Sequence, residues 1–134
     1  MKTLSPDRIS IGLCLVAGGL DLGTGLGLVA IPQWILPLMG VDVPGADGLV
    51  YLRFVGAFVA AVGATYLWVL AAPRERLRTV LGVTILFRLA AGGYSLAAIA
   101  LGTLPIAWIS VPVTDLGLVA LQSWLLAKGV GRHV

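Results

Sequence analysis

The chain has 134 residues, which is the length of a single domain. Apolar residues make up 59% of it and charged residues only 11%, whereas soluble domains average roughly 25% charged residues. Because a small soluble domain needs a largely polar surface, this composition excludes a soluble enzyme, a disordered chain and a nucleic-acid-binding protein, and it predicts a chain embedded in a lipid bilayer.

Four apolar segments are each long enough to cross the bilayer as a helix, which takes about 20 residues. They comprise residues 9–31, 49–72, 79–101 and 105–127. Runs such as residues 58–62 do not alternate between apolar and polar side chains, which argues against a membrane β-barrel. The sequence therefore predicts an all-α integral membrane protein in which residues 1–134 form one domain, a bundle of four transmembrane helices.

Between the first two segments, residues 33–39 are apolar but too few to span the bilayer. We expect them to lie in the outer membrane interface with Trp34 at headgroup depth, and a re-entrant element is the alternative. Turn-forming residues follow and predict a return to the membrane. They are Asp42, Pro44, Gly45, Asp47 and Gly48.

Lysine and arginine are distributed unevenly over the two sides of the predicted bundle. The side with the termini carries seven of them, and the loops on the other side, residues 32–48 and 102–104, carry none. Cytoplasmic loops are enriched in basic residues, so we expect the N- and C-termini to be cytoplasmic. The seven residues are Lys2, Arg8, Arg74, Arg76, Arg78, Lys128 and Arg132.

Small residues in the predicted spans favour close helix contacts, because they let two backbones approach each other in lipid. We expect such contacts either within the chain or between copies of it. The candidate packing residues are Gly19, Gly23 and Gly27 in the first span, Gly56 in the second and Gly92 in the third.

Charged residues inside the spans are the most informative feature of the sequence. Asp21, Arg88 and Asp115 come from three different spans, and each lies roughly 13–18 Å from a membrane face at 1.5 Å per residue. A charge at the bilayer centre costs about 2.5–3.5 kcal/mol, so we expect Arg88 to lie inside the bundle between the two aspartates. Arg53, only about 6 Å below the outer face, either joins this cluster or extends outward.

Further polar side chains recur at helical spacing around these charges, and they favour either a hydrated cavity or a hydrogen-bonded core. Two interpretations of the charged cluster remain open. It either fixes the helix arrangement as a structural element, or it forms a site for a small ligand or a proton. In both cases Asp21, Arg88 and Asp115 together carry one net negative charge, so either one carboxyl holds a proton or Arg53 balances the charge. The supporting residues are Thr24, Thr84, Ser95, Thr114 and Gln122.

Cofactor chemistry is restricted because the chain has one cysteine, Cys14, and one histidine, His133. One of each cannot build a disulfide, a structural zinc site or an iron–sulfur site within the chain. The terminal histidine also precludes an intramembrane Ser-His-Asp set. We therefore predict no catalytic residue, no metal site and no cofactor.

A series of short motifs between about residues 50 and 95 resembles small bacterial membrane proteins of the DoxX-like and BphX-like families. The motifs are Arg53-Phe54-Val55-Gly56, Tyr66-Leu67, Ala72-Pro73-Arg74, Arg78 and Arg88. The resemblance implies a four-span fold in a bacterial inner membrane. Those families have links to sulfur oxidation, redox partners and aromatic degradation, but a chain with one cysteine lacks the pair that thiol redox chemistry needs.

Two functions fit the sequence about equally well. The first is a homo-oligomer of parallel copies that binds or transports a small ligand or protons at the charged cluster. The second is a non-catalytic structural or accessory subunit of a larger membrane complex. A membrane enzyme that acts on a lipid-soluble substrate is a third possibility. The expected partners are the lipid bilayer and either further copies or other membrane proteins, with no nucleic acid.

Overall fold

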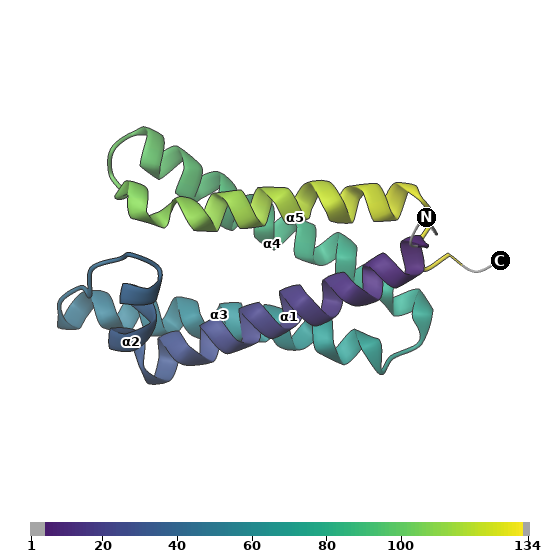
Figure 1. The fold of residues 1–134 in the computed structure, drawn as a ribbon, viewed down its shortest axis with the longest axis horizontal. Helices are drawn as coiled ribbons and strands as arrows, with labels where there is room; N and C mark the ends of the chain where they lie inside the picture. The colour runs from purple at the N-terminus through teal and green to yellow at the C-terminus, as the bar shows by residue number, and fades with distance from the viewer. Residues whose placement is uncertain (1–4, 133–134) are drawn as a thin grey trace. The chain divides into compact units, whose positions relative to one another are not determined.

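The computed structural model describes residues 5–132, which are helical with short connections and no strand. Three helices and the stretch Ile106–Ala127 are long and apolar enough to cross a membrane, which confirms the prediction of four such helices. Lys2 and His133 lie outside the described residues. The elements in Figure 1 are α1 (Pro6–Ala30), α2 (Pro32–Leu38), α3 (Ala46–Leu70), α4 (Arg74–Ala100), η1 (Ile106–Ile109) and α5 (Ser110–Ala127).

Proline and glycine set many of the helix boundaries. Pro6 and Pro32 are the first residues of α1 and α2, where a missing N–H group costs no helical hydrogen bond. Gly102, with a φ of 72°, ends α4 in the left-handed conformation that glycine adopts without strain. The chain then turns back, and the Thr103 N–H donates to the carbonyl oxygen of Ala98 at 2.9 Å.

The connection between α1 and α3 differs in part from the prediction. Residues 33–39 largely form a short helix, α2, in which Leu36 is buried and Trp34 is exposed. Asp47 and Gly48, predicted to belong to the turn, lie instead in the first turn of α3. The helix starts earlier because the Leu49 N–H already bonds to the Gly45 carbonyl, and an acidic residue is favourable near a helix N-terminus.

The chain divides into two compact units. The central unit, Leu13–Trp68, holds most of α1, with α2 and most of α3. The terminal unit combines Met1–Gly12 with Val69–Val134 and holds the start of α1 together with α4, η1 and α5. The charged residues of the predicted cluster are therefore distributed over both units, and each unit is described by itself below.

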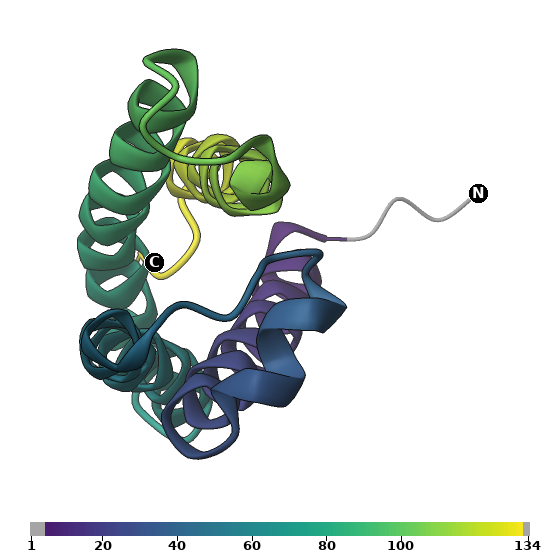
Figure 2. The same ribbon diagram turned by 90° about the vertical axis from the view of Figure 1, so that its left-hand side faces the viewer.

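In the central unit, α1 and α3 lie side by side with their backbones in direct contact (Figure 2). A Cβ atom added to Gly25 would lie 2.3 Å from the Ala60 nitrogen, and one added to Gly63 would lie 2.3 Å from the Leu22 nitrogen. Only glycine fits at such positions. Tyr66, one turn after Gly63, is fully buried, and its Cβ atom lies 2.8 Å from the position of a Cβ added to Gly18.

In the terminal unit, α4 and α5 pack along each other (Figure 1). Leu81 and Leu125 are fully buried. At one end of the pair, a guanidinium nitrogen of Arg78 donates a hydrogen bond to the Leu126 carbonyl oxygen at 3.3 Å. A cation at the C-terminal end of a helix complements the helix dipole, so this contact stabilises the end of α5. The α4–α5 pair provides the framework for the candidate site.

Candidate functional site

An ion pair between α4 and α5 forms the centre of the candidate site. The Nη1 atom of Arg88 donates to the Oδ1 atom of Asp115 at a distance of 2.6 Å. The side chain of Arg88 is 4% exposed and that of Asp115 is 14% exposed. A charge-assisted hydrogen bond of this length is short and strong, and burial removes most of the water that would weaken it.

This ion pair lies near the middle of both helices. Arg88 is 14 residues from the start of α4 and 12 from its end, or about 21 Å and about 18 Å along the helix axis. Asp115 is about 13 Å from Ile106 and about 18 Å from Ala127. If these helices cross a bilayer whose hydrocarbon layer is about 30 Å thick, the pair lies deep within that layer.

Gly92 allows the two helices to approach where the pair forms. It lies one turn after Arg88 on α4 and is buried against α5. A Cβ atom added to Gly92 would lie 3.0 Å from the Asp115 Cβ atom and 3.2 Å from the Leu116 Cγ atom, which is tighter than ordinary contact. The small residue therefore keeps α4 close enough to α5 for the short hydrogen bond.

Three buried polar side chains of the same unit accompany the pair, all of them predicted as supporting residues. Thr84 and Ser95 lie on α4 one and two turns from Arg88, and Gln122 lies two turns after Asp115 on α5. The Thr84 hydroxyl donates to the Val80 carbonyl at 2.7 Å, which leaves its oxygen lone pairs as acceptors. Thr114, also predicted, is exposed.

The other predicted members of the cluster belong to the central unit. Asp21 and Thr24 lie on α1 and are both half-buried. The position of Asp21 beside Arg88 stays a prediction, because these two residues are in different units. Arg53 lies on α3 with its side chain exposed, about 10 Å along the helix from Ala46. This exposure favours the outward-extending arrangement over membership of the cluster.

The predicted packing glycines separate into two groups. Gly27 lies against the Ile35 side chain of α2, while Gly56 and Gly92 lie in tight helix contacts. Gly19 and Gly23, in contrast, have nothing within 4 Å of an added Cβ atom among residues 5–132. Contacts of these two glycines between copies stay a prediction.

The packing face of α1 is defined instead by Gly18 and Gly25, which lie one residue before Gly19 and two after Gly23. Sequence reasoning missed their partner Gly63 on α3. One signal could have found it, because Gly18 and Gly25 are seven residues apart and so are Gly56 and Gly63. Equal seven-residue spacing on two spans places small residues along one seam of two packed helices.

Among residues 5–132, no three side chains of the His, Cys, Asp or Glu type come together in a way that could hold a metal ion. Comparisons of the chain with models of protein families, with curated proteins and with solved structures give no significant match.

Proposed function

We propose that the chain is a multi-pass membrane protein that binds or transports protons or a small charged ligand at the Arg88–Asp115 pair, and that this activity also needs Asp21 on α1. The observation that carries this proposal is the short, buried ion pair near the middle of two helices that are long enough to span a bilayer. Ionisable residues at such depth are costly and commonly mark ion or substrate pathways.

The chemistry of the pair suggests how it would work. As a carboxylate, Asp115 neutralises the charge of Arg88, so the ion pair is stable while its hydrogen bond is formed. A proton on the carboxyl would remove its charge and weaken its attraction for the guanidinium. A small anion could then bind to Arg88, because a guanidinium fits carboxylate and phosphate groups with two parallel hydrogen bonds. Proton uptake and anion binding would therefore be coupled at one place.

Location and assembly complete the proposal. The uneven distribution of Lys and Arg supports cytoplasmic termini, and the resemblance to DoxX-like and BphX-like proteins supports a bacterial inner membrane. Four helices enclose little space, so we propose that parallel copies form a homo-oligomer. The pathway of the proton or ligand would then run past the Arg88–Asp115 pair of each copy or between copies.

Proton flux into liposomes that contain the purified chain tests the proposal. Vesicles with a pH-sensitive dye inside and an imposed potassium gradient with valinomycin would report proton entry. We expect flux with the wild type and its loss in Asp115→Asn and in Asp21→Asn. Asp47→Asn, in the first turn of α3, is the matched control. Equal flux in all four proteins, or flux no greater than in empty vesicles, would contradict the transport of protons at this site.

The alternative function is a non-catalytic subunit of a larger membrane complex, in which the ion pair only fixes the arrangement of α4 and α5. The face of α1 that carries Gly19 and Gly23 favours this alternative, since none of residues 5–132 lies within 4 Å of a Cβ atom added there and another membrane helix could pack against it. Gentle extraction from the native membrane followed by mass spectrometry separates the two functions. A partner protein that leaves when Gly19 or Gly23 is replaced by Leu supports the subunit, and a pure homo-oligomer contradicts it.

A further inference from the structure

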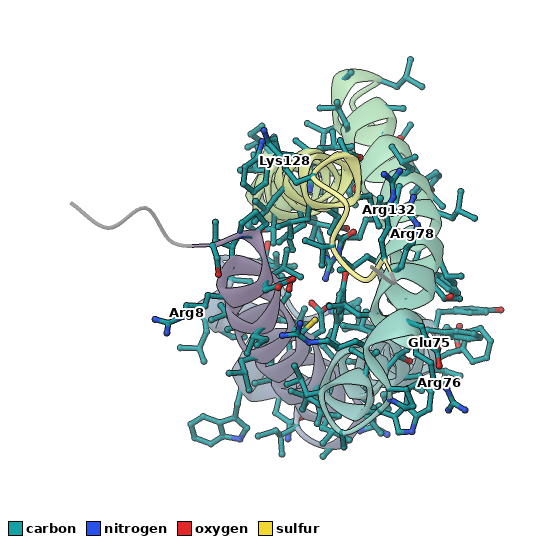
Figure 3. The ribbon with its side chains drawn as sticks, turned by 90° about the vertical axis from the view of Figure 1, so that its right-hand side faces the viewer. Arg8, Glu75, Arg76, Arg78, Lys128 and Arg132 are labelled. Carbon is teal, nitrogen blue, oxygen red and sulfur yellow. The ribbon has the colours of Figure 1, made fainter. Side chains whose placement is uncertain are left out.

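The end of the terminal unit at which α1 and α4 begin and α5 ends carries most of the basic residues of the chain. Figure 3 views the molecule from this end and labels the residues concerned. Helix ends of this kind lie at headgroup depth when the helices cross a bilayer. The labelled basic residues are Arg8, Arg76, Arg78, Lys128 and Arg132, and the acidic Glu75 lies among them.

A cavity of about 110 Å³ opens at the same end, between the start of α1, the end of α3 and the start of α4. Asp7, Ser10 and Arg74 provide its polar lining. Part of its wall is apolar and includes Ile11, Leu70 and Leu77. The cavity has room for a small polar group rather than for a hydrocarbon chain.

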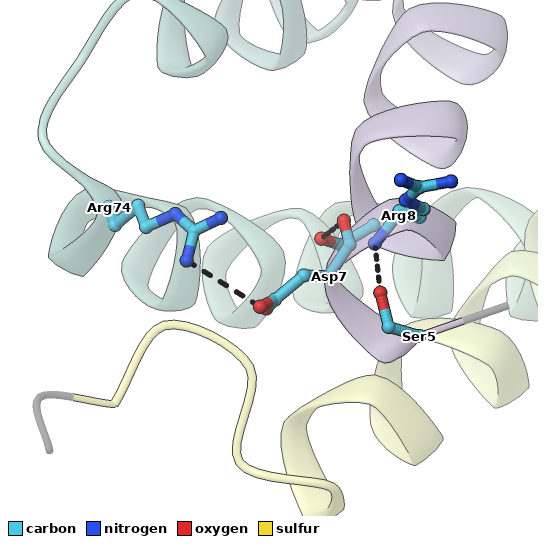
Figure 4. A network of polar contacts seen from close by, with 5 residues as sticks. Ser5, Asp7, Arg8 and Arg74 are labelled. Carbon is cyan, nitrogen blue, oxygen red and sulfur yellow. Dashed lines mark hydrogen bonds and ion pairs between the residues drawn. The ribbon is translucent and has the colours of Figure 1, made fainter.

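The two charged residues of this cavity form a loose pair. Arg74 Nη1 lies 3.5 Å from Asp7 Oδ2, and their side chains are 78% and 51% exposed (Figure 4). Exposed pairs of this kind contribute little to stability, so opening the pair costs little. Arg74 has four further N–H donors and Asp7 a second carboxylate oxygen, and both can bind another charged molecule.

The charges of the cavity lining complement a molecule that carries one cationic and one anionic group close together. An ammonium group would bind to the Asp7 carboxylate, and a phosphate would bind to the Arg74 guanidinium with two hydrogen bonds. An attached acyl chain would continue along the apolar wall formed by Ile11 and Leu70. A purely anionic headgroup would place no positive charge on Asp7, and a choline headgroup has no N–H group to donate.

We propose that this cavity binds the headgroup of a zwitterionic phospholipid with a primary ammonium, which is the chemistry of phosphatidylethanolamine. The proposal rests on the chain lying in a bilayer, as does the proposed function, but it does not depend on any activity of the Arg88–Asp115 pair. Failure of one therefore leaves the other intact.

Native mass spectrometry of the full chain in detergent, titrated with lipids of identical acyl chains, tests this site. We expect phosphatidylethanolamine to bind about tenfold more tightly than phosphatidylcholine or phosphatidylglycerol, which corresponds to about 1.4 kcal/mol. Stepwise N-methylation of the headgroup should reduce binding in the wild type at each step, a result that needs no variant. Soluble glycerophosphoethanolamine should bind far more weakly, because it lacks the acyl chains.

Two variants assign the preference to the cavity. Asp7→Asn should abolish the preference for the ammonium headgroup, and Arg74→Gln should weaken the binding of all three lipids. Arg8→Gln and Lys128→Gln, at the same end but outside the cavity lining, are the matched controls and should bind like the wild type. Equal binding of the three lipids, a preference unchanged by Asp7→Asn, or strongest binding of phosphatidylglycerol with loss in the control variants would overturn the proposal.

Discussion

Replacement of Gly25 by alanine tests the close contact between α1 and α3. The added methyl carbon would lie 2.3 Å from the Ala60 nitrogen and 2.6 Å from the Gly56 carbonyl oxygen. Carbon atoms in contact prefer about 3.5 Å, so the helices would have to separate locally by about 1 Å. The clash is with backbone atoms, which no side-chain rotation can relieve, and overpacking of this kind costs about 1–3 kcal/mol.

Gly23→Ala is the matched control, because it adds the same methyl group two residues earlier where nothing lies within 4 Å. Both variants gain about 0.5–1 kcal/mol of helix propensity, so their difference isolates the contact with α3. Unfolding of the purified proteins in mixed micelles of increasing SDS content, followed by tryptophan fluorescence, gives the free energies. We expect Gly23→Ala to equal or exceed the wild type and Gly25→Ala to be less stable. Equal stability of the two variants would refute the described helix contact.

Three further changes test the terminal unit by the same unfolding measurement. Gly92→Ala should lower the free energy of unfolding by about 1 kcal/mol, because the added methyl group meets Asp115. Gly93→Ala, whose methyl group meets nothing within 4 Å, should not lower it. Equal effects of the two variants would refute the close approach of α4 and α5. Arg88→Leu leaves a buried carboxylate without this counter-ion and should cost about 3–5 kcal/mol, so a neutral effect would contradict a buried ion pair. Arg78→Gln removes a hydrogen bond to the end of α5 and should cost about 1 kcal/mol, and an unchanged protein would show that this bond contributes nothing.

The four apolar helices could be predicted from the sequence because length and hydropathy alone determine whether a helix can span a bilayer. The positions of Arg88 and Asp115 near the middle of their helices also followed from counting residues, since the rise of a helix is constant. Pairing between these two residues was the arrangement of lowest cost for charges in lipid.

The face with which each helix packs against its neighbour was harder to predict. Gly19 lies one residue after Gly18 and Gly23 lies two residues before Gly25, and a helix turns by about 100° per residue, so the two pairs of glycines lie on different faces of α1. One span therefore offers several small-residue stripes, and only the complementary stripe of α3 decides which is used. The cavity beside Asp7 lay beyond sequence reasoning for a related reason, because its lining comes from segments far apart in the chain.

The measurement that tests the central claim most directly is proton flux through a double variant, Arg88→Gln with Asp115→Asn. It removes both charges and keeps side chains that can hydrogen-bond to each other. Because both members of the pair are replaced, neither of them remains as a buried charge without the other, so we expect the double variant to fold. We predict that it conducts no protons in liposomes in which the wild type does. Wild-type flux in the folded double variant would contradict the claim that this pair is the functional centre of the protein.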